Sequence, residues 1–235
     1  MLEKFMRKLL LSFMLAFSFT ASASEVSKEN PYQMIEEAAK ITFDRFAREK
    51  AEIKKNPEIL KVIVKEELMP YVSYEYAGLK VLGNYRKEAS REDILAFLEA
   101  FQNYLITSYA QVFTLYEQQE VIFEPAKPIN AEKILLVGVD ILNGDGPAIN
   151  IKFKVRKFAR KNDKGKVTHY DWLAFDLVAE GISLLDAKQK ELRSILAQNG
   201  VVKVTEMLKE KSERKIVFKN DEDIQAKLKE QDTGE

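Results

Sequence analysis

Residues 148–158 read AINIKFKVRKF, in which apolar and polar side chains alternate. The apolar positions are Ile149, Ile151, Phe153 and Val155, and the polar ones are Asn150, Lys152, Lys154 and Arg156. Because successive side chains of a β-strand point to opposite faces, this pattern predicts a strand with one apolar and one basic face. We expect the basic face to lie in water and helices to cover the apolar face.

Three neighbouring segments also have the composition of strands, namely residues 120–123, 133–142 and 167–178. The sequences NGDGP at 143–147 and KNDKG at 161–165 predict turns between consecutive strands. Connections this short join antiparallel neighbours. The sequence therefore predicts a four-stranded antiparallel sheet.

Helices are expected on both sides of these strands in the chain. Asn30-Pro31 and Asn56-Pro57 are helix start signals, and Pro70 is expected to end the second of these helices. A short helix is expected over 73–82, closed by Gly83, and a long one over 91–116 behind a capping pattern at Ser90. Two more are expected over 185–198 and 201–211. Helices followed by strands and then helices indicate an α+β domain.

The N-terminus has the pattern of a secretory signal peptide. Lys4, Arg7 and Lys8 precede an apolar run over 9–19, and Ala21-Ser22-Ala23 fits the small-residue rule for cleavage before Ser24. The run is shorter than the about 20 residues that a membrane-spanning helix needs. We therefore expect a signal peptide over 1–23, one domain over 24–218 and a charged tail over 219–235.

The amino-acid composition argues against three further properties: a disulfide, a covalent lipid anchor and nucleic-acid binding. There is no cysteine, so we expect neither a disulfide nor an N-terminal lipid anchor on the exported chain. Residues 24–235 contain 34 basic and 36 acidic residues. A nearly neutral domain has no general electrostatic attraction for nucleic acid.

Catalytic chemistry finds little support in the sequence. His169 is the only histidine, and without cysteine it cannot form a His/Cys metal cluster. No nucleophile-elbow sequence accompanies it. An enzyme would need a buried acid–base pair, for which Asp140, Asp176 and Tyr104 are the candidates. A third possibility is an exported adaptor that binds proteins through the basic face of the sheet.

Four stretches, in this order, carry a resemblance to a known family. They are NPYQ at 30–33 with AAK at 38–40; ELMPYV at 67–72 with YAGLKVLG at 76–83; FQNYLITSY at 101–109; and YDW at 170–172 with AEGIS at 179–183. This ordered set resembles the periplasmic phospholipid-binding component of the Mla lipid-trafficking system, the toluene-tolerance auxiliary family. The resemblance covers about residues 30–212.

The resemblance implies a nuclear-transport-factor-2-like fold, in which helices pack on a curved antiparallel sheet around an apolar lipid cavity. It also implies a soluble periplasmic carrier that moves phospholipid between an outer-membrane lipoprotein–porin complex and an inner-membrane ABC transporter complex, and so maintains outer-membrane lipid asymmetry. Phospholipid would be its cargo, with no cofactor, no metal and no nucleic acid partner. The alternative is an isomerase- or dehydratase-type enzyme that uses the same cone-shaped pocket.

Following the resemblance, we expect a lipid-binding wall on the sheet and another on the helices. The expected sheet wall is Val139, Ile141, Ile151, Phe153, Leu173 and Phe175. The expected helical wall is Tyr76, Leu79, Leu82, Phe97, Phe101, Tyr104 and Leu105. The segment 70–83, short and bounded by a proline and a glycine, is the expected gate.

Overall fold

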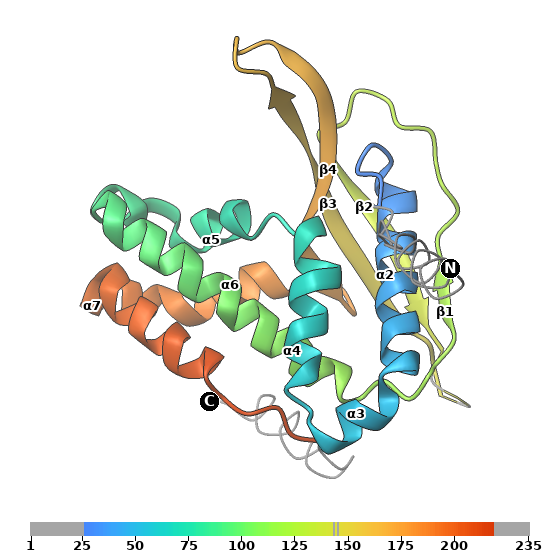
Figure 1. Ribbon diagram of the computed structural model, residues 1–235. Helices are drawn as coiled ribbons and strands as arrows, with labels where there is room; N and C mark the ends of the chain where they lie inside the picture. The colour runs from blue at the N-terminus through green and yellow to red at the C-terminus, as the bar shows by residue number, and fades with distance from the viewer. Residues whose placement is uncertain (1–25, 143, 145, 219–235) are drawn as a thin grey trace, which may run out of the picture.

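The computed structural model describes residues 26–142, 144 and 146–218. The expected signal peptide over 1–23 and the tail over 219–235 lie outside the described residues, as do two positions of the 143–147 turn. One antiparallel sheet runs through the molecule, with α2 across its apolar face and a group of three helices packed beside it (Figure 1). This arrangement confirms the predicted α+β class.

The sheet has five strands in the order β1-β2-β3-β4-β5, each antiparallel to its neighbour. They are β1 Val121–Phe123, β2 Ile134–Ile141, β3 Ile149–Lys161, β4 Val167–Ala179 and β5 Ile182–Ser183. The predicted number of four was too low because β5 has two residues, too few to form an alternating pattern. It follows a tight turn in which Glu180 and Gly181 have φ of 49° and 82°.

A bulge interrupts the pairing of β3 with β4. Val155 lies opposite Ala174, but the next residue, Lys154, lies opposite Asp176. Phe175 is therefore an extra residue on β4. Before it, even-numbered residues of β4 share the face of the apolar β3 residues; after it, odd-numbered residues do. Ala174 before the bulge and Leu177 after it lie opposite the apolar residues of β3.

Helix α2, Pro31–Arg48, covers the apolar face of the sheet (Figure 1). As predicted, Asn30 is its N-cap, and the side-chain oxygen accepts from the backbone N–H of Tyr32 at 3.0 Å and of Gln33 at 3.3 Å. Buried residues of α2 pack on the sheet around Trp172, which is 1% exposed.

The chain then returns toward the sheet through short helical segments. These are α3 Lys50–Lys55, α4 Ile59–Ile63, a π-helical turn over Val64–Leu68 and a 3-10 turn over Met69–Tyr71. The helix expected after Asn56 is therefore regular α-helix only to Ile63. The return path ends against the sheet, where Ser73 N donates to Ala174 O at 2.7 Å.

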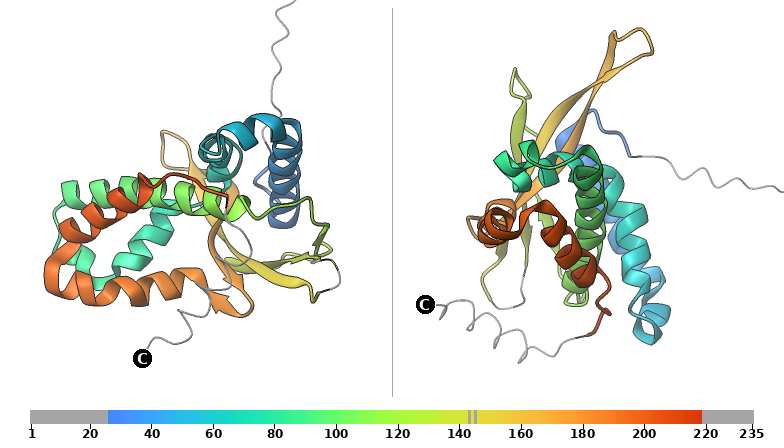
Figure 2. Two further views of the ribbon diagram at one scale, coloured as in Figure 1. Left: turned by 90° about the horizontal axis from the view of Figure 1, so that it is seen from below. Right: turned by 90° about the vertical axis from the view of Figure 1, so that its left-hand side faces the viewer.

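Three helices pack together as a separate layer, seen from below in Figure 2. They are α5 Tyr74–Leu82, α6 Arg91–Phe113 and α7 Leu184–Ser212, with a 3-10 turn over Gly83–Lys87 after α5. Gly83 has a φ of 53° and ends α5 as predicted. Gly200, with a φ of 71°, kinks α7 between the two C-terminal helices that the sequence predicted.

The basic face of β3 lies only partly in water: Lys152 is exposed as expected, but its neighbours on this face are not. Lys154 and Arg156 are half-buried, because α5 and the start of α7 pack against this side of the sheet. Lys154 Nζ lies 2.7 Å from Asp176 Oδ2, and the Arg156 guanidinium lies 4.3 Å from the centre of the Tyr76 ring. Alternation showed which residues share a face, but not that Lys154 and Arg156 have partners there.

In the part of the chain that the structure describes, no helix is both long enough and apolar enough to cross a membrane.

Candidate functional site

A cavity of about 210 Å³ lies between the sheet, α2 and the C-terminal half of α6. Apolar side chains form nearly all of its wall. Sheet residues include Val121, Phe123, Val139, Ile141, Ile151, Phe153, Ala174 and Leu177; helical residues include Ala39, Thr42, Phe43, Tyr109, Val112 and Phe113. Such a lining favours an apolar ligand held by burial rather than by specific polar contacts.

The few polar groups in this wall mostly have partners within the protein. Thr42 Oγ1 donates to Ala38 O at 2.7 Å. Asp176 Oδ2 accepts from Ser183 Oγ at 2.7 Å and Oδ1 accepts from Leu185 N at 3.0 Å. Burial, with smaller effects from the charge of Asp176 and from Tyr104, raises the pKa of Tyr109 to about 12. Tyr109 therefore remains neutral, and the cavity presents little charge to a ligand.

A second cavity of about 110 Å³ adjoins the first on the side of the three-helix layer. Both cavities are lined by Val72, Tyr109, Phe175, Asp176 and Leu177. Phe175, the bulge residue, therefore contributes to both. These shared residues separate two apolar spaces, and a shift of them would join the spaces into a branched volume.

The expected sheet wall largely coincides with the larger cavity. Val139, Ile141, Ile151, Phe153 and Phe175 line it. Leu173 does not, because it lies opposite Arg156, on the face turned away from this cavity. Uninterrupted alternation would place Leu173 and Phe175 on one face, but the bulge at Phe175 breaks that alternation.

The expected helical wall, on α5 and α6, coincides less well with the cavities, because the α6 residues of the larger cavity lie further along the helix. Phe101, Tyr104 and Leu105 line the smaller cavity only. Tyr76, Leu79, Leu82 and Phe97 line neither of the two cavities. Leu82 and Phe97 are fully buried in the core of the three-helix layer.

The sequence alone does not identify the residues that form the helical wall of the larger cavity. Tyr109 and Val112 belong to the apolar stripe of the long helix, and Ala39 and Thr42 belong to the stripe of α2. Those stripes show that a side chain faces inward. Which part of a stripe borders a cavity depends on where the helices cross the sheet.

The segment expected to act as a gate is firmly packed. Val81 and Leu82 are 1% and 0% exposed. Gly78 lies so close to α6 that a Cβ there would be 2.7 Å from a methyl carbon of Leu98. Opening over 70–83 would therefore disrupt the core between α5 and α6.

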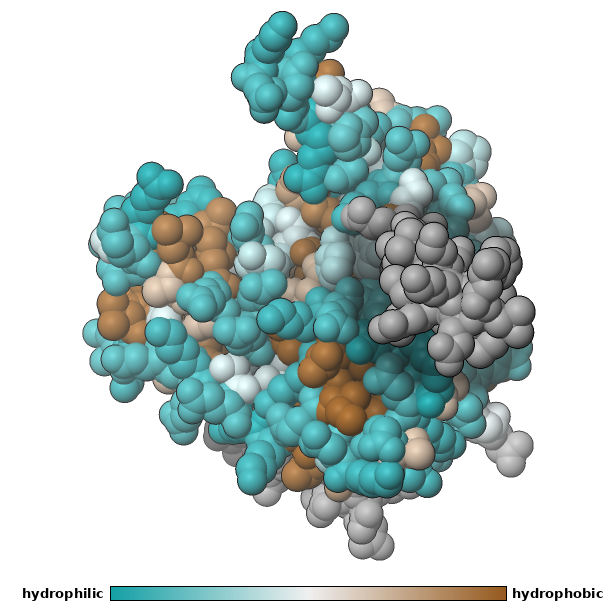
Figure 3. Space-filling view, in the orientation of Figure 1, coloured by the Kyte–Doolittle hydropathy of each residue, from teal (hydrophilic) through white to brown (hydrophobic). Residues whose placement is uncertain are grey.

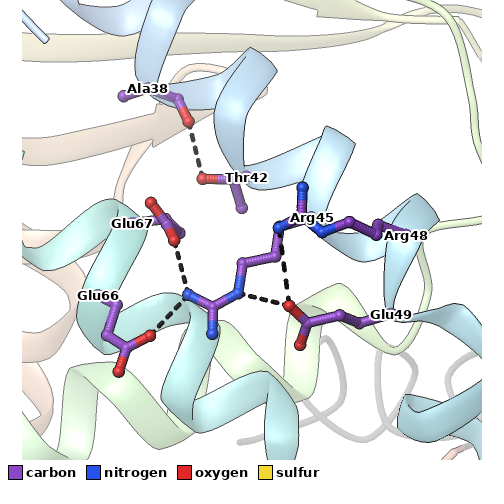
Figure 4. Close-up of polar contacts among 7 residues, drawn as sticks. All are labelled: Ala38, Thr42, Arg45, Arg48, Glu49, Glu66 and Glu67. Carbon is purple, nitrogen blue, oxygen red and sulfur yellow. Dashed lines mark hydrogen bonds and ion pairs between the residues drawn. The ribbon is translucent and has the colours of Figure 1, made fainter. Parts of the chain in front are cut away.

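An ionic cluster fastens the C-terminal end of α2 (Figure 4). The Arg45 guanidinium lies 2.6 Å from both Glu66 and Glu67 and 2.9 Å from Glu49, and the Arg45 side chain is only 16% exposed. Burial lowers the pKa of Arg45, but the hydrogen bonds to Glu66, Glu67 and Glu49 outweigh it and hold the pKa above its usual value. At the other end, Trp172 N donates to Lys28 O at 2.7 Å. Polar contacts thus hold the chain just before the N-terminus of α2 and near its C-terminus.

Of the three residues considered for an enzyme, Asp176 and Tyr104 both line the smaller cavity, whereas Asp140 lines neither cavity. Asp140 Oδ1 accepts from Asn150 Nδ2 at 2.7 Å, and the neighbours Val139 and Ile141 are the ones that line the cavity. The Asp176 carboxylate is occupied by Lys154, Ser183 and α7. His169 lies exposed on the β3–β4 hairpin, with Nδ1 3.0 Å from Thr168 Oγ1.

Among residues 26–142, 144 and 146–218, no group of three or more His, Cys, Asp or Glu side chains is placed to hold a metal ion.

Two comparisons of this sequence with known proteins point to the same family. The family model described as MlaC protein matches residues 36–210. The intermembrane phospholipid transport system binding protein MlaC of Haemophilus influenzae is 30% identical over 210 residues, which cover 89% of this chain and 94% of that protein.

A solved structure has the same fold. It is a phospholipid-binding protein from Ralstonia solanacearum in complex with a phospholipid, and it superposes with a TM-score of 0.64 at 16% identity. The match covers 78% of this chain and 97% of that one. This likeness supports the arrangement of helices on the curved sheet.

Proposed function

The chain belongs to the MlaC family, and on that premise we propose that it carries a phospholipid with its acyl chains in the apolar cavity between α2, α6 and the sheet. The observation that carries this proposal is the cavity itself, with an almost wholly apolar wall and a tyrosine that stays neutral. The phospholipid named for the Ralstonia protein fits the same cargo class.

The energetics favour a carrier with such a cavity. A two-tailed phospholipid has roughly 30 methylene groups, and each is worth about 0.8 kcal/mol when kept from water. Crossing an aqueous space unaided would thus cost on the order of 20 kcal/mol. A carrier must offset most of this cost, yet still release the lipid to a bilayer. Apolar burial without strong polar anchors meets both conditions.

Loading a whole phospholipid requires the cavity to enlarge. Its volume of about 210 Å³ is below the roughly 300–1,000 Å³ typical of pockets for drug-sized ligands. Helix α2 is our candidate for the moving element, because it lies across the cavity and its contact with the sheet is largely apolar packing, with polar contacts at Lys28 and Arg45. We expect acyl chains to displace α2 from the sheet and to join the two cavities.

The proposal also includes where in the cell the protein works and which complexes it meets. The expected signal peptide over 1–23 would release the chain into the periplasm of a Gram-negative cell. There it would exchange lipid with an inner-membrane ABC transporter complex and an outer-membrane lipoprotein–porin complex. The name of the Haemophilus relative, an intermembrane transport system binding protein, supports this assignment.

The proposal is tested by the lipid content of the purified protein. The chain is produced with its leader in a Gram-negative host, purified from the periplasm without detergent and extracted with organic solvent. We expect about one phospholipid per chain. Extracts that contain no phospholipid, from folded protein, would contradict the proposal.

A further inference from the structure

The end of the β3–β4 hairpin stands clear of the rest of the molecule (Figures 1 and 2). Pairing of β2 with β3 ends at Arg156, and on the other edge Trp172 N donates to Lys28 O. Further out, the strand residues from Phe158 to Lys161 pair only with β4 among the described residues. An isolated two-stranded hairpin is marginally stable, so this extension adds little to the fold.

Positive charge is concentrated on this extension. Residues 157–170 contain five basic residues and one acidic residue, whereas the whole chain has 37 of each. Arg160 is already paired with Asp171 at 2.6 Å. Lys161, Lys164 and Lys166 are exposed and form no ion pair with any residue that the structure describes. Figure 3 shows the protruding tip as strongly hydrophilic.

The same hairpin carries two partly exposed apolar side chains: Val167 lies opposite Lys161, and the Tyr170 ring lies 4.9 Å from Lys157 Nζ. Val167 is 37% exposed and Tyr170 is 47% exposed. Tyrosine is enriched where bilayers meet water, and lysine can lay its methylene stem on apolar surface while its ammonium stays in a polar layer. Lysines with an exposed tyrosine therefore match the phosphate-rich surface of a bilayer.

An acidic protein surface is a poorer match. Recognition of carboxylates on proteins favours arginine, whose planar guanidinium binds both oxygens at once. The only arginine of this extension, Arg160, is occupied by Asp171. Apart from Lys157, which lies over the Tyr170 and Trp172 rings, the remaining charges are exposed lysines, which suit a diffuse layer of phosphate groups.

We propose that the tip of the β3–β4 hairpin, residues 157–170, docks the protein on the surface of an anionic phospholipid bilayer. This inference goes beyond lipid carriage, because it assigns a membrane contact to a surface separate from the cavity. Lys161 is eight residues along β3 from Phe153 in the cavity wall, a distance of ~26 Å at the usual rise of a strand. A docked hairpin would therefore leave the cavity free to exchange lipid.

The test is co-sedimentation of the mature protein with vesicles. Vesicles of phosphatidylcholine containing about one-third phosphatidylglycerol are compared with vesicles of phosphatidylcholine alone, at low and at high salt. We expect binding to the anionic vesicles only, lost at high salt because the charges are screened. The variant Lys161→Gln/Lys164→Gln/Lys166→Gln should bind on the order of 100-fold more weakly, since each lysine near an anionic surface contributes about fivefold.

The matched control removes three exposed lysines elsewhere, as Lys65→Gln/Lys87→Gln/Lys190→Gln, with the same change in net charge. It should bind within about twofold of wild type. Equal binding of the hairpin variant and wild type would overturn the proposal. Binding to immobilised polyglutamate but not to anionic vesicles would overturn it in favour of an acidic protein partner. Native mass spectrometry of the same variants measures cargo binding independently of membrane docking. We expect the lipid occupancy of both variants to equal that of wild type.

Discussion

Lys154 and Asp176 lie directly opposite each other on β3 and β4, with Lys154 Nζ 2.7 Å from Asp176 Oδ2. The Asp176 side chain is 1% exposed and also accepts hydrogen bonds from Ser183 Oγ and from the backbone N–H of Leu185. One carboxylate thus joins the two long strands to the start of α7. It lies immediately after the bulge, where both cavities meet.

Replacing this carboxylate should destabilise the whole fold. In Asp176→Ala, the Lys154 ammonium and two donors at the start of α7 lose their acceptor. We expect a loss of about 2–4 kcal/mol in the free energy of unfolding, measured by urea denaturation. The control Asp163→Ala, in the exposed 161–165 turn, should change it by less than about 0.5 kcal/mol. Equal stabilities of the two variants would show that the junction has no structural role.

The second prediction concerns Arg45, which fastens α2 over the cavity. Arg45→Met keeps the length of the side chain but leaves Glu66 and Glu67 without their shared cation. We expect a loss of about 1–3 kcal/mol in stability and faster amide hydrogen exchange along α2. If α2 moves during loading, lipid should also leave this variant faster in a vesicle transfer assay.

Arg48 provides the control for Arg45, because it is 68% exposed and 3.8 Å from Glu49. We expect Arg48→Met to match wild type in stability, amide exchange and lipid release. If Arg45→Met has the same rate of amide hydrogen exchange along α2 as wild type, the ionic cluster does not hold α2 in place.

The third prediction uses the raised pKa of Tyr109. Its hydroxyl should titrate near pH 12, as measured by the difference in near-ultraviolet absorbance between wild type and Tyr109→Phe. Because the folded pKa exceeds the usual value of about 10, the neutral tyrosine favours the folded state. That stabilisation is complete below about pH 10 and is lost as the pH rises through 12. A difference signal centred near pH 10 would place Tyr109 in contact with bulk water.

Local chemistry accounts for the parts of the fold that the sequence predicted. Asn30 and Pro31 start α2 because the amide side chain satisfies free N–H groups, and Gly83 and Gly200 adopt the positive φ that other residues avoid. These features depend on a few consecutive residues. They can therefore be inferred without knowledge of the rest of the chain.

The features in which the cavities differ from the expected walls depend on distant residues. Leu173 was assigned to the cavity wall because nothing in the sequence of β4 reveals the bulge at Phe175. The α6 residues expected in the helical wall run from Phe97 to Leu105, whereas Tyr109 borders both cavities; the apolar stripe of α6 includes all of them. Which part borders the cavity is set by how α2 and α6 cross the sheet.

The central claim is that phospholipid occupies the cavity, and a substitution at Ile151 tests this claim most directly. Ile151 lies in the cavity wall on β3, and its neighbour Lys152 is exposed on the opposite face. A carboxylate at position 151 would have to lose its water to share the cavity with acyl chains, at a cost of several kcal/mol. Lys152→Glu introduces the same group one residue away, outside the cavity.

Native mass spectrometry of wild type, Ile151→Glu and Lys152→Glu therefore provides the decisive measurement, with circular dichroism to establish that all three are folded. We predict one phospholipid bound to wild type and to Lys152→Glu, and an occupancy at least about tenfold lower in Ile151→Glu. Equal phospholipid occupancy in all three proteins would contradict the claim that the acyl chains lie in this cavity.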